Sequence, residues 1–344
     1  MRAVVLTRHG PPEVLQVQER PDPEPGPGQL RVAVEAAGVN FADLLARIGT
    51  YPDAPKPPCV LGYEVAGTVD VLGDGVDGFH AGQRVVAGIR FNGQSELAVV
   101  NAADVLPIPD GMSYAEATAI PVNYATAYAG LVLMAGIEAT DRVLIHAAAG
   151  GVGTAAVQIA HHAGAEVIGT ASAAKHARVR EQGADHMIDY RNDDVVAEVR
   201  RITNGEGVDI SLNALGPKYL RRDWQLLRPG GCVVAYGVSQ LVKGERRDLR
   251  AALGTVMSFP FSTMPWWKAT GMMNENRGVF GLNMLHWWDR EGSLARVIDP
   301  LQKLMDAGVV RPVVDSTFPF DGAADAHRHL TEARNVGKVV LTPR

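Results

Sequence analysis

Short apolar runs separated by turn residues occupy the first hundred residues. Strands are expected where apolar and β-branched residues dominate, at 3–7, 30–39, 65–73 and 83–88 (AVVLT, LRVAVEAAGV, VAGTVDVLG and QRVVAG). The intervening PGPG, GDG and FNG are typical of turns. The pattern therefore predicts a small antiparallel, barrel-like domain. The run 21–28 (PDPEPGPG) is interpreted as a wide turn between two strands rather than a linker between domains.

From Arg142 the pattern changes, and apolar strands alternate with helices that carry apolar residues at helical spacing. The expected strands cover 142–147, 165–171, 186–190, 208–215 and 232–237. Five short apolar strands alternating with helices predict an α/β fold with a doubly wound parallel Rossmann sheet. The tail from about Leu294 is expected to run helix, strand, helix, strand.

Composition and charge exclude several classes of protein. Hydrophobic residues make up 47% and charged residues 21% of the 344 residues, which excludes wholesale disorder and a fibrous chain. The net charge of −5 gives no basic face for nucleic acid. Cys59 and Cys232 are the two cysteines, so a disulfide framework and a four-cysteine metal lobe are excluded. A cytoplasmic, reducing setting fits best.

One uncharged stretch, 117–137, is long enough to span a bilayer. It contains Pro121, Asn123 and Thr126, and its first half has few strongly apolar side chains. We therefore expect a buried helix rather than a membrane span.

The segment 146–153 (HAAAGGVG) lies between an expected strand and an expected helix. It matches the G-x-G-x-x-G fingerprint of dinucleotide-binding turns, with Ala148 in place of the first glycine. Gly150 would let the backbone approach a pyrophosphate, and Gly153 would allow close packing of helix on strand. The N–H groups at the helix N-terminus favour an anion. The alternative is a glycine-rich turn used only for packing.

The end of the second strand of this unit distinguishes NADPH from NADH. An NAD site places Asp or Glu there for the ribose 2′-hydroxyl. This chain has Gly169-Thr170-Ala171-Ser172-Ala173-Ala174-Lys175, which contains no acid. Ser172 and Lys175 could bind a 2′-phosphate by hydrogen bond and charge. NADPH is therefore the expected cofactor, although Lys175 could equally be a solvated helix residue.

Several motifs together resemble a known family. They are GVNFADLLARIGTY (38–51), GYEVAGTV (62–69), PVNYATAYAGL (121–131), HAAAGGVGTAAVQIA (146–160), GADHMIDY (183–190) and NVGKVVL (335–341). The chain resembles the zinc-free quinone oxidoreductase (zeta-crystallin-like) group of the medium-chain dehydrogenases/reductases, and within it the vesicle amine transport protein branch. The resemblance implies a Rossmann domain at 121–289 and a GroES-like β-barrel substrate domain at 1–120 with 290–344. It also implies a homodimer.

The resemblance also implies roles for residues beside the nicotinamide. Asn40 and Tyr51 match polar residues that orient a substrate carbonyl, and Thr126 matches a threonine that faces the nicotinamide end. Asn283 is expected near the carboxamide. Lys338 is expected to reach the cofactor from the C-terminal segment.

Other matched positions are expected along the rest of the cofactor. The residues that match the pyrophosphate turn are Gly150, Gly151, Val152 and Gly153. Ser172, Lys175 and Tyr190 match the clamp on the adenosine 2′-phosphate, and Asn213 is expected near the ribose.

No metal is expected. The zinc-dependent relatives carry a cysteine and a histidine where this chain has Asn40 and Tyr63, and neither of these is a plausible zinc ligand here.

Several of these residues have alternative roles in the fold alone. Asn40 and Asp43 could cap the short helix at FADLLAR. Tyr51 and Tyr190 could be half-buried packing residues. His146 is interpreted as a satisfied interior histidine, and Glu64 could be a structural ion-pair partner.

The segment 256–288 is rich in aromatic residues and methionine, which mark an adaptable apolar surface. Its aromatic residues are Phe259, Phe261, Trp266, Trp267, Phe280, Trp287 and Trp288. A homodimer interface, the lid of a pocket for apolar substrates and contact with a membrane surface are the three interpretations. Lys268 and Arg277 are its few basic residues, which disfavours electrostatic membrane anchoring.

Two functions therefore stand at this point. The first is an NADPH-dependent reductase of small apolar quinones or α,β-unsaturated carbonyl compounds, with Asn40 and Tyr51 at the substrate and the proton supplied by water or Tyr51. The second is a low-turnover NADPH-binding protein whose aromatic segment binds a lipid, a membrane or a protein partner. Asn40 and Tyr51 are both polar, which favours the first.

Overall fold

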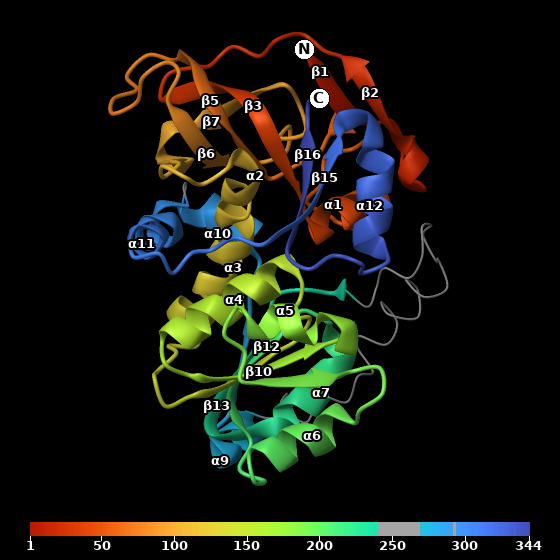
Figure 1. The fold of residues 1–344 in the computed structure, drawn as a ribbon, viewed down its shortest axis with the longest axis vertical. Helices are drawn as coiled ribbons and strands as arrows, with labels where there is room; N and C mark the ends of the chain where they lie inside the picture. Colours follow the sequence, from red (N-terminus) through yellow and green to blue (C-terminus); the bar gives the residue numbers. More distant parts are fainter. Residues whose placement is uncertain (240–268, 292–293) are drawn as a thin grey trace. The chain divides into compact units, whose positions relative to one another are not determined.

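The computed structural model describes residues 1–239, 269–291 and 294–344 (Figure 1). The described chain forms two compact units. Met1–Ala125 and Met284–Arg344 belong to the first, and 126–239 with 269–283 belong to the second. The boundary expected at 289/290 lies inside helix α10 (Met284–Glu291), so the chain enters the first unit before this helix.

The first unit is built on antiparallel β-structure, as predicted. Its large sheet has the strand order β15-β16-β3-β5-β6-β8, with β7 also paired to β3. These strands are β3 (Gln29–Val39), β5 (Glu64–Leu72), β6 (Arg84–Gly88), β7 (Leu97–Asn101), β8 (Val105–Pro107), β15 (Val314–Pro319) and β16 (Lys338–Thr342). A second sheet contains β1 (Arg2–Leu6), β2 (Leu15–Glu19) and β4 (Cys59–Val60).

The first unit also contains five α-helices among the described residues. They are α10 and α1 (Phe41–Arg47), α2 (Tyr114–Ala117), α11 (Ala295–Asp306) and α12 (Ala323–Thr331). Alternating side chains of the strands fill the core, because successive residues of a strand point to opposite faces. Leu30, Val32 and Val34 of β3 are buried together with Val65 of β5 and Leu341 of β16. Each fully buried aliphatic side chain of this kind contributes roughly 1.5–3 kcal/mol.

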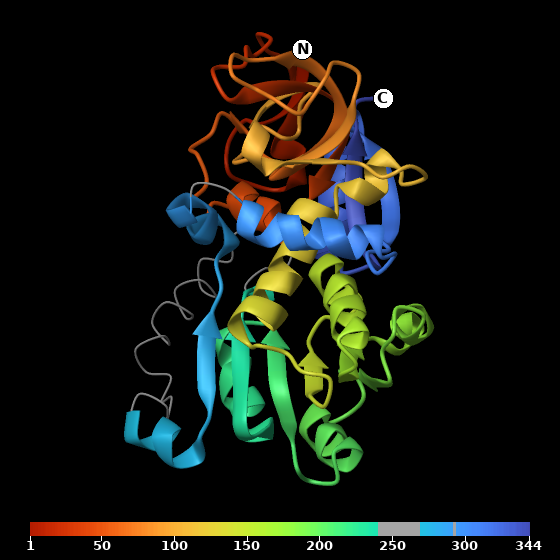
Figure 2. The same ribbon diagram turned by 90° about the vertical axis from the view of Figure 1, so that its left-hand side faces the viewer.

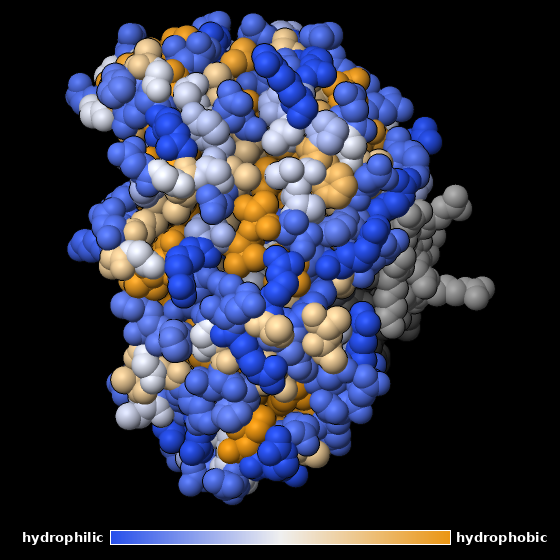
Figure 3. Space-filling view, in the orientation of Figure 1, coloured by the Kyte–Doolittle hydropathy of each residue, from blue (hydrophilic) through white to orange (hydrophobic). Residues whose placement is uncertain are grey.

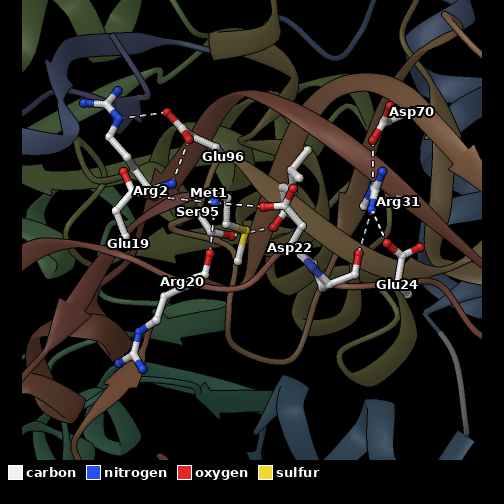
Figure 4. Close-up of polar contacts among 12 residues, drawn as sticks. Met1, Arg2, Glu19, Arg20, Asp22, Glu24, Arg31, Asp70, Ser95 and Glu96 are labelled. Carbon is white, nitrogen blue, oxygen red and sulfur yellow. Dashed lines mark hydrogen bonds and ion pairs between the residues drawn. The ribbon is translucent and has the colours of Figure 1, made fainter.

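The proline-rich run 21–28 is a wide turn between β2 and β3, as predicted. Arg31 of β3 holds it in place (Figure 4). The Arg31 guanidinium donates hydrogen bonds to Asp70 Oδ2 of β5 at 2.7 Å and to Glu24 Oε1 of the turn at 3.0 Å. The same arginine therefore joins two strands and fixes the turn.

The second unit is a parallel α/β sheet with the strand order β11-β10-β9-β12-β13-β14. Its strands are β9 (Arg142–Ile145), β10 (Glu166–Ala171), β11 (His186–Asp189), β12 (Val208–Asn213), β13 (Leu227–Ala235) and β14 (Gly278–Gly281). Its helices include α3 (Ala125–Tyr128), α4 (Gly151–His162), α5 (His176–Arg180), α6 (Val195–Ile202), α7 (Pro217–Leu226) and α9 (Ala269–Glu275). The predicted doubly wound parallel sheet is confirmed.

Helices cover both faces of this sheet (Figures 1 and 2). Val233 of β13 packs in a cluster with residues of α6 and α7. The position of Gly130, in the helical segment Ala129–Met134, lies beside the next residue of β13, Val234. Because successive strand residues point to opposite faces, the two helix layers lie on opposite sides. Strand order reverses between β9 and β12, and such a switch point is where open α/β sheets bind ligands.

The helix Tyr114–Met134 is long and apolar enough to cross a membrane by length and composition alone. In its most apolar window, 72% of the residues are buried inside the protein, as expected for a core helix. On the face drawn in Figure 3, polar residues predominate and apolar ones lie in separate patches.

Candidate functional site

The carboxyl ends of the parallel strands bring together most of the predicted cofactor residues. Ala171 is the register partner of Asp189, so Ser172 and Tyr190 follow two adjacent strand ends. On the other side of the switch point, Asn213 pairs with Ala235, which pairs with Gly281. Residues far apart in sequence therefore lie along the edge of this sheet that the carboxyl ends of its strands form.

The glycine turn connects β9 to α4 at the same edge. The Ala148 N–H donates to Thr170 O of β10 at 3.0 Å, which ties the turn to the neighbouring strand. A Cβ on Gly153 would lie 2.2 Å from Ala147 O, so glycine at this position lets α4 pack closely against the backbone of the turn that follows β9. Gly150 is the N-cap residue of α4 and supplies no capping side chain.

Gly151 and Val152, the first residues of α4, are partly exposed. The first N–H groups of an α-helix have no partner within the helix, and they bind anions well. The turn therefore offers a backbone site for a phosphate group.

Ser172 and Lys175 lie in the short segment after β10. Ser172 is buried and precedes a single helical turn that ends at Lys175, which is partly exposed. Tyr190 is 48% exposed, with the Arg191 guanidinium 5.9 Å from its ring centre. Asp189, the last residue of the adjacent strand β11, carries a carboxylate at this end of the sheet. This carboxylate accepts hydrogen bonds from Asn192 Nδ2 at 2.6 Å and from the Arg191 N–H.

Asn213 is held inside the second unit, which restricts what it can do. Its Oδ1 accepts from the N–H groups of Leu215 and Gly216 at 2.8 and 3.0 Å. Its Nδ2 donates to Asp223 Oδ2, and the side chain is fully buried. The Asn213 side chain, which the sequence places near a ribose, therefore also shapes the turn after β12.

Asp223 of α7 is the centre of a buried polar network. His146 Nε2 lies 3.1 Å from Asp223 Oδ1, and His146 Nδ1 lies 3.2 Å from Thr170 Oγ1. Burial by itself would raise the pKa of Asp223, but His146 and Arg222 hold it below its ordinary value. His146 is thus a satisfied interior histidine, as predicted.

The remaining two predicted cofactor residues of the second unit lie at its borders. Thr126 of α3 is buried. Asn283 is exposed and follows β14.

In the first unit, Asn40 lies in a buried polar cluster with Glu64 and Lys338. Asn40 Nδ2 donates to Glu64 Oε1 at 2.6 Å, and Lys338 Nζ donates to Asn40 Oδ1 at 2.7 Å and to Glu64 Oε1. The Lys338 side chain is 1% exposed, and its ammonium is engaged by these two residues. Glu64 is the structural ion-pair partner that the sequence suggested.

Asp43 supports Asn40 from the first turn of α1. Its Oδ2 accepts from the Asn40 N–H at 2.8 Å, and its Oδ1 accepts from the Gly62 N–H at 3.0 Å. Burial raises the pKa of Asp43 to about 7. Asn40 and Asp43 therefore do brace the start of this helix, in addition to any role at a substrate.

Tyr51 is partly buried against the apolar core of the first unit. Its ring lies edge-on to that of Tyr63, with 6.4 Å between ring centres. Burial raises the pKa of Tyr51 to about 12, so its hydroxyl keeps its proton at neutral pH.

The two residues at the positions of zinc ligands in zinc-dependent relatives, Asn40 and Tyr63, contact other side chains of the protein. The Asn40 amide is bonded to Glu64 and Lys338, and Tyr63 packs against Phe91 with 5.1 Å between ring centres. Among residues 1–239, 269–291 and 294–344, no three His, Cys, Asp or Glu side chains are grouped so as to hold a metal ion.

The described part of the aromatic segment 256–288 does not form one surface. Trp288 is buried and donates through Nε1 to Asp104 Oδ2 at 3.0 Å, so it belongs to the core of the first unit. Phe280 of β14 is 40% exposed. Phe259, Phe261, Trp266 and Trp267 lie outside the described residues.

Sequence reasoning missed the importance of Asp223. The sequence did contain a sign of its burial, because Asp223 lies among Leu220, Trp224 and Leu226, the apolar residues of the same helix. A carboxylate on the apolar face of a helix needs buried partners.

Two family models match the chain. Residues 26–129 match the alcohol dehydrogenase GroES-like domain, and residues 182–341 match the family described as zinc-binding dehydrogenase. The human synaptic vesicle membrane protein VAT-1 homolog is 39% identical over 352 residues, covering 100% of this chain and 86% of that protein. The chain belongs to the medium-chain dehydrogenase/reductase family. The resemblance to this family and to the vesicle protein branch, inferred from the motifs, is confirmed.

Solved structures of other family members have the same fold as this medium-chain dehydrogenase/reductase. A quinone oxidoreductase from Pseudomonas syringae pv. Tomato DC3000 has a TM-score of 0.82 and is 28% identical, covering 99% of each chain. The CurK enoyl reductase has a TM-score of 0.83 and is 28% identical, covering 99% of this chain and 98% of its own. A mycobacterial protein complexed with NADPH has a TM-score of 0.83 and is 28% identical, covering 100% of each. The chain is thus an oxidoreductase of this family.

The second unit of this family member fits a nicotinamide cofactor. The absence of a side chain at Gly153 lets the start of α4 lie close against the backbone of the turn, and no side chain caps the N-terminus of α4. Both features suit a pyrophosphate.

Proposed function

We propose that this chain is an NADPH-dependent oxidoreductase that reduces quinones or α,β-unsaturated carbonyl compounds without zinc. The observation that carries the proposal is the sheet edge of the second unit, where the glycine turn, Ser172 and Tyr190 meet. Strand β10 ends there without an acidic residue. The structural similarity to a quinone oxidoreductase and an enoyl reductase supports the choice of acceptor.

The residues of the second unit would hold the cofactor in two places. The backbone of Gly150, Gly151, Val152 and Gly153 would take the pyrophosphate. Ser172, Lys175 and Tyr190 would hold the adenosine 2′-phosphate, for which a missing acid at the end of β10 removes repulsion. When bound, NADPH supplies the hydride that the acceptor takes up.

In the first unit, Asn40 and Tyr51 would orient the oxygen of the acceptor. Both are neutral hydrogen-bond donors. The Asn40 amide does not ionise, and the raised pKa of Tyr51, about 12, keeps its hydroxyl protonated. A protonated phenol of this pKa stabilises a developing negative charge by donating a hydrogen bond, and water then supplies the proton to the product. Asn40 and Tyr63 stand at the zinc-ligand positions, which supports chemistry without zinc.

We also propose a cytoplasmic homodimer joined through β14. Among the described residues this strand is the last of the six-stranded sheet, and the outer backbone groups of an edge strand can pair with a second copy. Phe280 on β14 and Met273 on α9 are exposed by 40% and 72%. Sedimentation equilibrium of wild type and Phe280→Asp tests this: a wild-type monomer would contradict it.

The decisive experiment follows NADPH oxidation at 340 nm with a panel of quinones, enones and alcohols, and NADH in parallel. Turnover of a quinone or an enone with NADPH is the expected result. Tight NADPH binding without turnover of any acceptor would contradict the proposal and favour the alternative, an NADPH-binding protein with a partner or membrane ligand.

A further inference from the structure

Three neighbouring strands of the first unit bring one residue each into the buried cluster around Asn40. Asn40 directly follows β3, Glu64 is the first residue of β5, and Lys338 is the first residue of β16. Strand β3 pairs with both of the others, through Val39 with Val339 and through Ala37 with Val65. The antiparallel pairing therefore fixes the three polar residues at one end of the sheet.

The two charged partners determine which way the Asn40 amide faces. A lysine ammonium can only donate hydrogen bonds, and an ionised carboxylate can only accept them. Oδ1 must therefore face Lys338, at 2.7 Å, and Nδ2 must face Glu64, at 2.6 Å. The flipped amide would set donor against donor and acceptor against acceptor.

The backbone around this amide is equally constrained. The Asn40 N–H donates to Asp43 Oδ2, which fixes the start of α1. A Cβ on Gly38 would lie 2.0 Å from Glu64 Oε1 and 2.6 Å from Lys338 Cε, so glycine at this position makes room for the pair. The ion pair is thus built closely against the strand that carries Asn40.

One hydrogen-bond donor of the amide is left over. Asn40 Nδ2 carries two N–H groups. One of them is bonded to Glu64, and within the described chain the other has no protein acceptor. Asn40 as a whole is 8% exposed, so little of the residue is open to a ligand, and this N–H is the donor of the amide with hydrogen-bonding capacity to spare.

We infer that Glu64 and Lys338 are positioning residues, which lock the Asn40 amide so that a single N–H is presented to the acceptor oxygen. This inference rests on the proposed reduction of quinones or enones. Neither charged residue touches the acceptor, and both act through Asn40. A pre-oriented donor contributes more to a transition state than a mobile one, because the cost of its orientation is already met in the fold.

The test is a double-mutant cycle with a charge-balanced variant. Glu64→Gln/Lys338→Met removes both charges together, which avoids an unpaired buried ion. In the wild-type background we expect kcat for the acceptor to fall by roughly 10- to 100-fold while NADPH affinity is unchanged. In the Asn40→Ala background the same pair of substitutions should change kcat by less than about twofold. Equal losses in both backgrounds would overturn the inference.

Arg31→Met is the matched control. It breaks another ion pair between β3 and β5, with Asp70, and therefore measures the effect of weakening the same sheet. We expect it to leave kcat unchanged. If Arg31→Met lowered kcat as much as the charge-balanced variant does, the effect of Glu64 and Lys338 would be explained by the stability of the sheet. That result would overturn the inference.

A second readout does not depend on turnover. Selective ¹⁵N labelling of asparagine gives a side-chain NH₂ signal for Asn40, assigned by its loss in Asn40→Asp. Its hydrogen exchange should accelerate in Glu64→Gln/Lys338→Met and stay unchanged in Arg31→Met; equal exchange in all three proteins would overturn the inference. If the wild type reduces no acceptor, the proposed function fails, while this measurement still decides whether the amide is locked.

Discussion

Lys338 Nζ donates a 2.7 Å hydrogen bond to Asn40 Oδ1 across 298 positions of the sequence. The contact closes a buried cluster whose third member is Glu64. Lysine is rarely buried without a partner, because desolvation of its charge is costly. The C-terminal strand therefore has a role beyond closing the sheet, since it holds the polar residue that would contact a substrate.

Replacing Asn40 by alanine should lower turnover without affecting the cofactor. We expect Asn40→Ala to reduce kcat with a quinone or an enone by roughly 10- to 100-fold, through loss of an oriented donor. NADPH affinity, measured by fluorescence titration, should stay nearly unchanged. Asn101→Ala, which removes an exposed amide bonded to Gln29, is the control. Unchanged turnover in Asn40→Ala would exclude Asn40 from the mechanism.

A carboxylate at the end of β10 should reverse the cofactor preference. In Ser172→Asp, the new charge would repel a 2′-phosphate and could bond a ribose 2′-hydroxyl. We expect the ratio of kcat/KM for NADPH to that for NADH to fall by about tenfold or more. Ser113→Asp, at the N-cap of α2 in the first unit, is the control, because aspartate also caps helices. A ratio that stays constant would mean that Ser172 lies away from the 2′ position.

Filling the glycine turn should damage both stability and cofactor binding. The Cβ of Gly153→Ala would lie 2.2 Å from Ala147 O, so the turn or α4 must shift. We expect a loss of about 1–3 kcal/mol in the free energy of unfolding and a higher Kd for NADPH. Gly278→Ala is matched, since its Cβ would meet Cys232 Cβ at 3.7 Å. Wild-type values for both quantities in Gly153→Ala would contradict the packing role of this glycine.

Asp43 should make stability depend on pH in a definite direction. Burial raises its pKa from 3.8 to about 7, so the folded chain binds a proton that the unfolded chain has already released. The stabilisation from this proton is complete below about pH 4 and is lost progressively as the pH rises to about 7. Over this range, wild type should lose on the order of 4 kcal/mol relative to Asp43→Asn in urea unfolding. A difference between the two proteins that is independent of pH would refute this.

The sequence by itself determined the features that depend on neighbouring residues. The apolar runs, their turn residues and the helical spacing after Arg142 predicted an antiparallel unit followed by a parallel one, and both are present. The turn at 146–153 could be located because a helix that begins this close to the backbone of its preceding turn requires glycine at position 153. Such constraints act within a few residues, so they are visible in the order of residue types.

Only the tertiary structure decided which polar groups share a partner. Nothing near Lys338 in the sequence points to Glu64, and nothing near His146 points to Asp223. Trp288, expected on an apolar surface, is buried inside the first unit, where Asp104 accepts its N–H. Burial and hydrogen-bond partners depend on how distant strands and helices pack, and the energy of a charge or an amide is set by the partners that this packing provides.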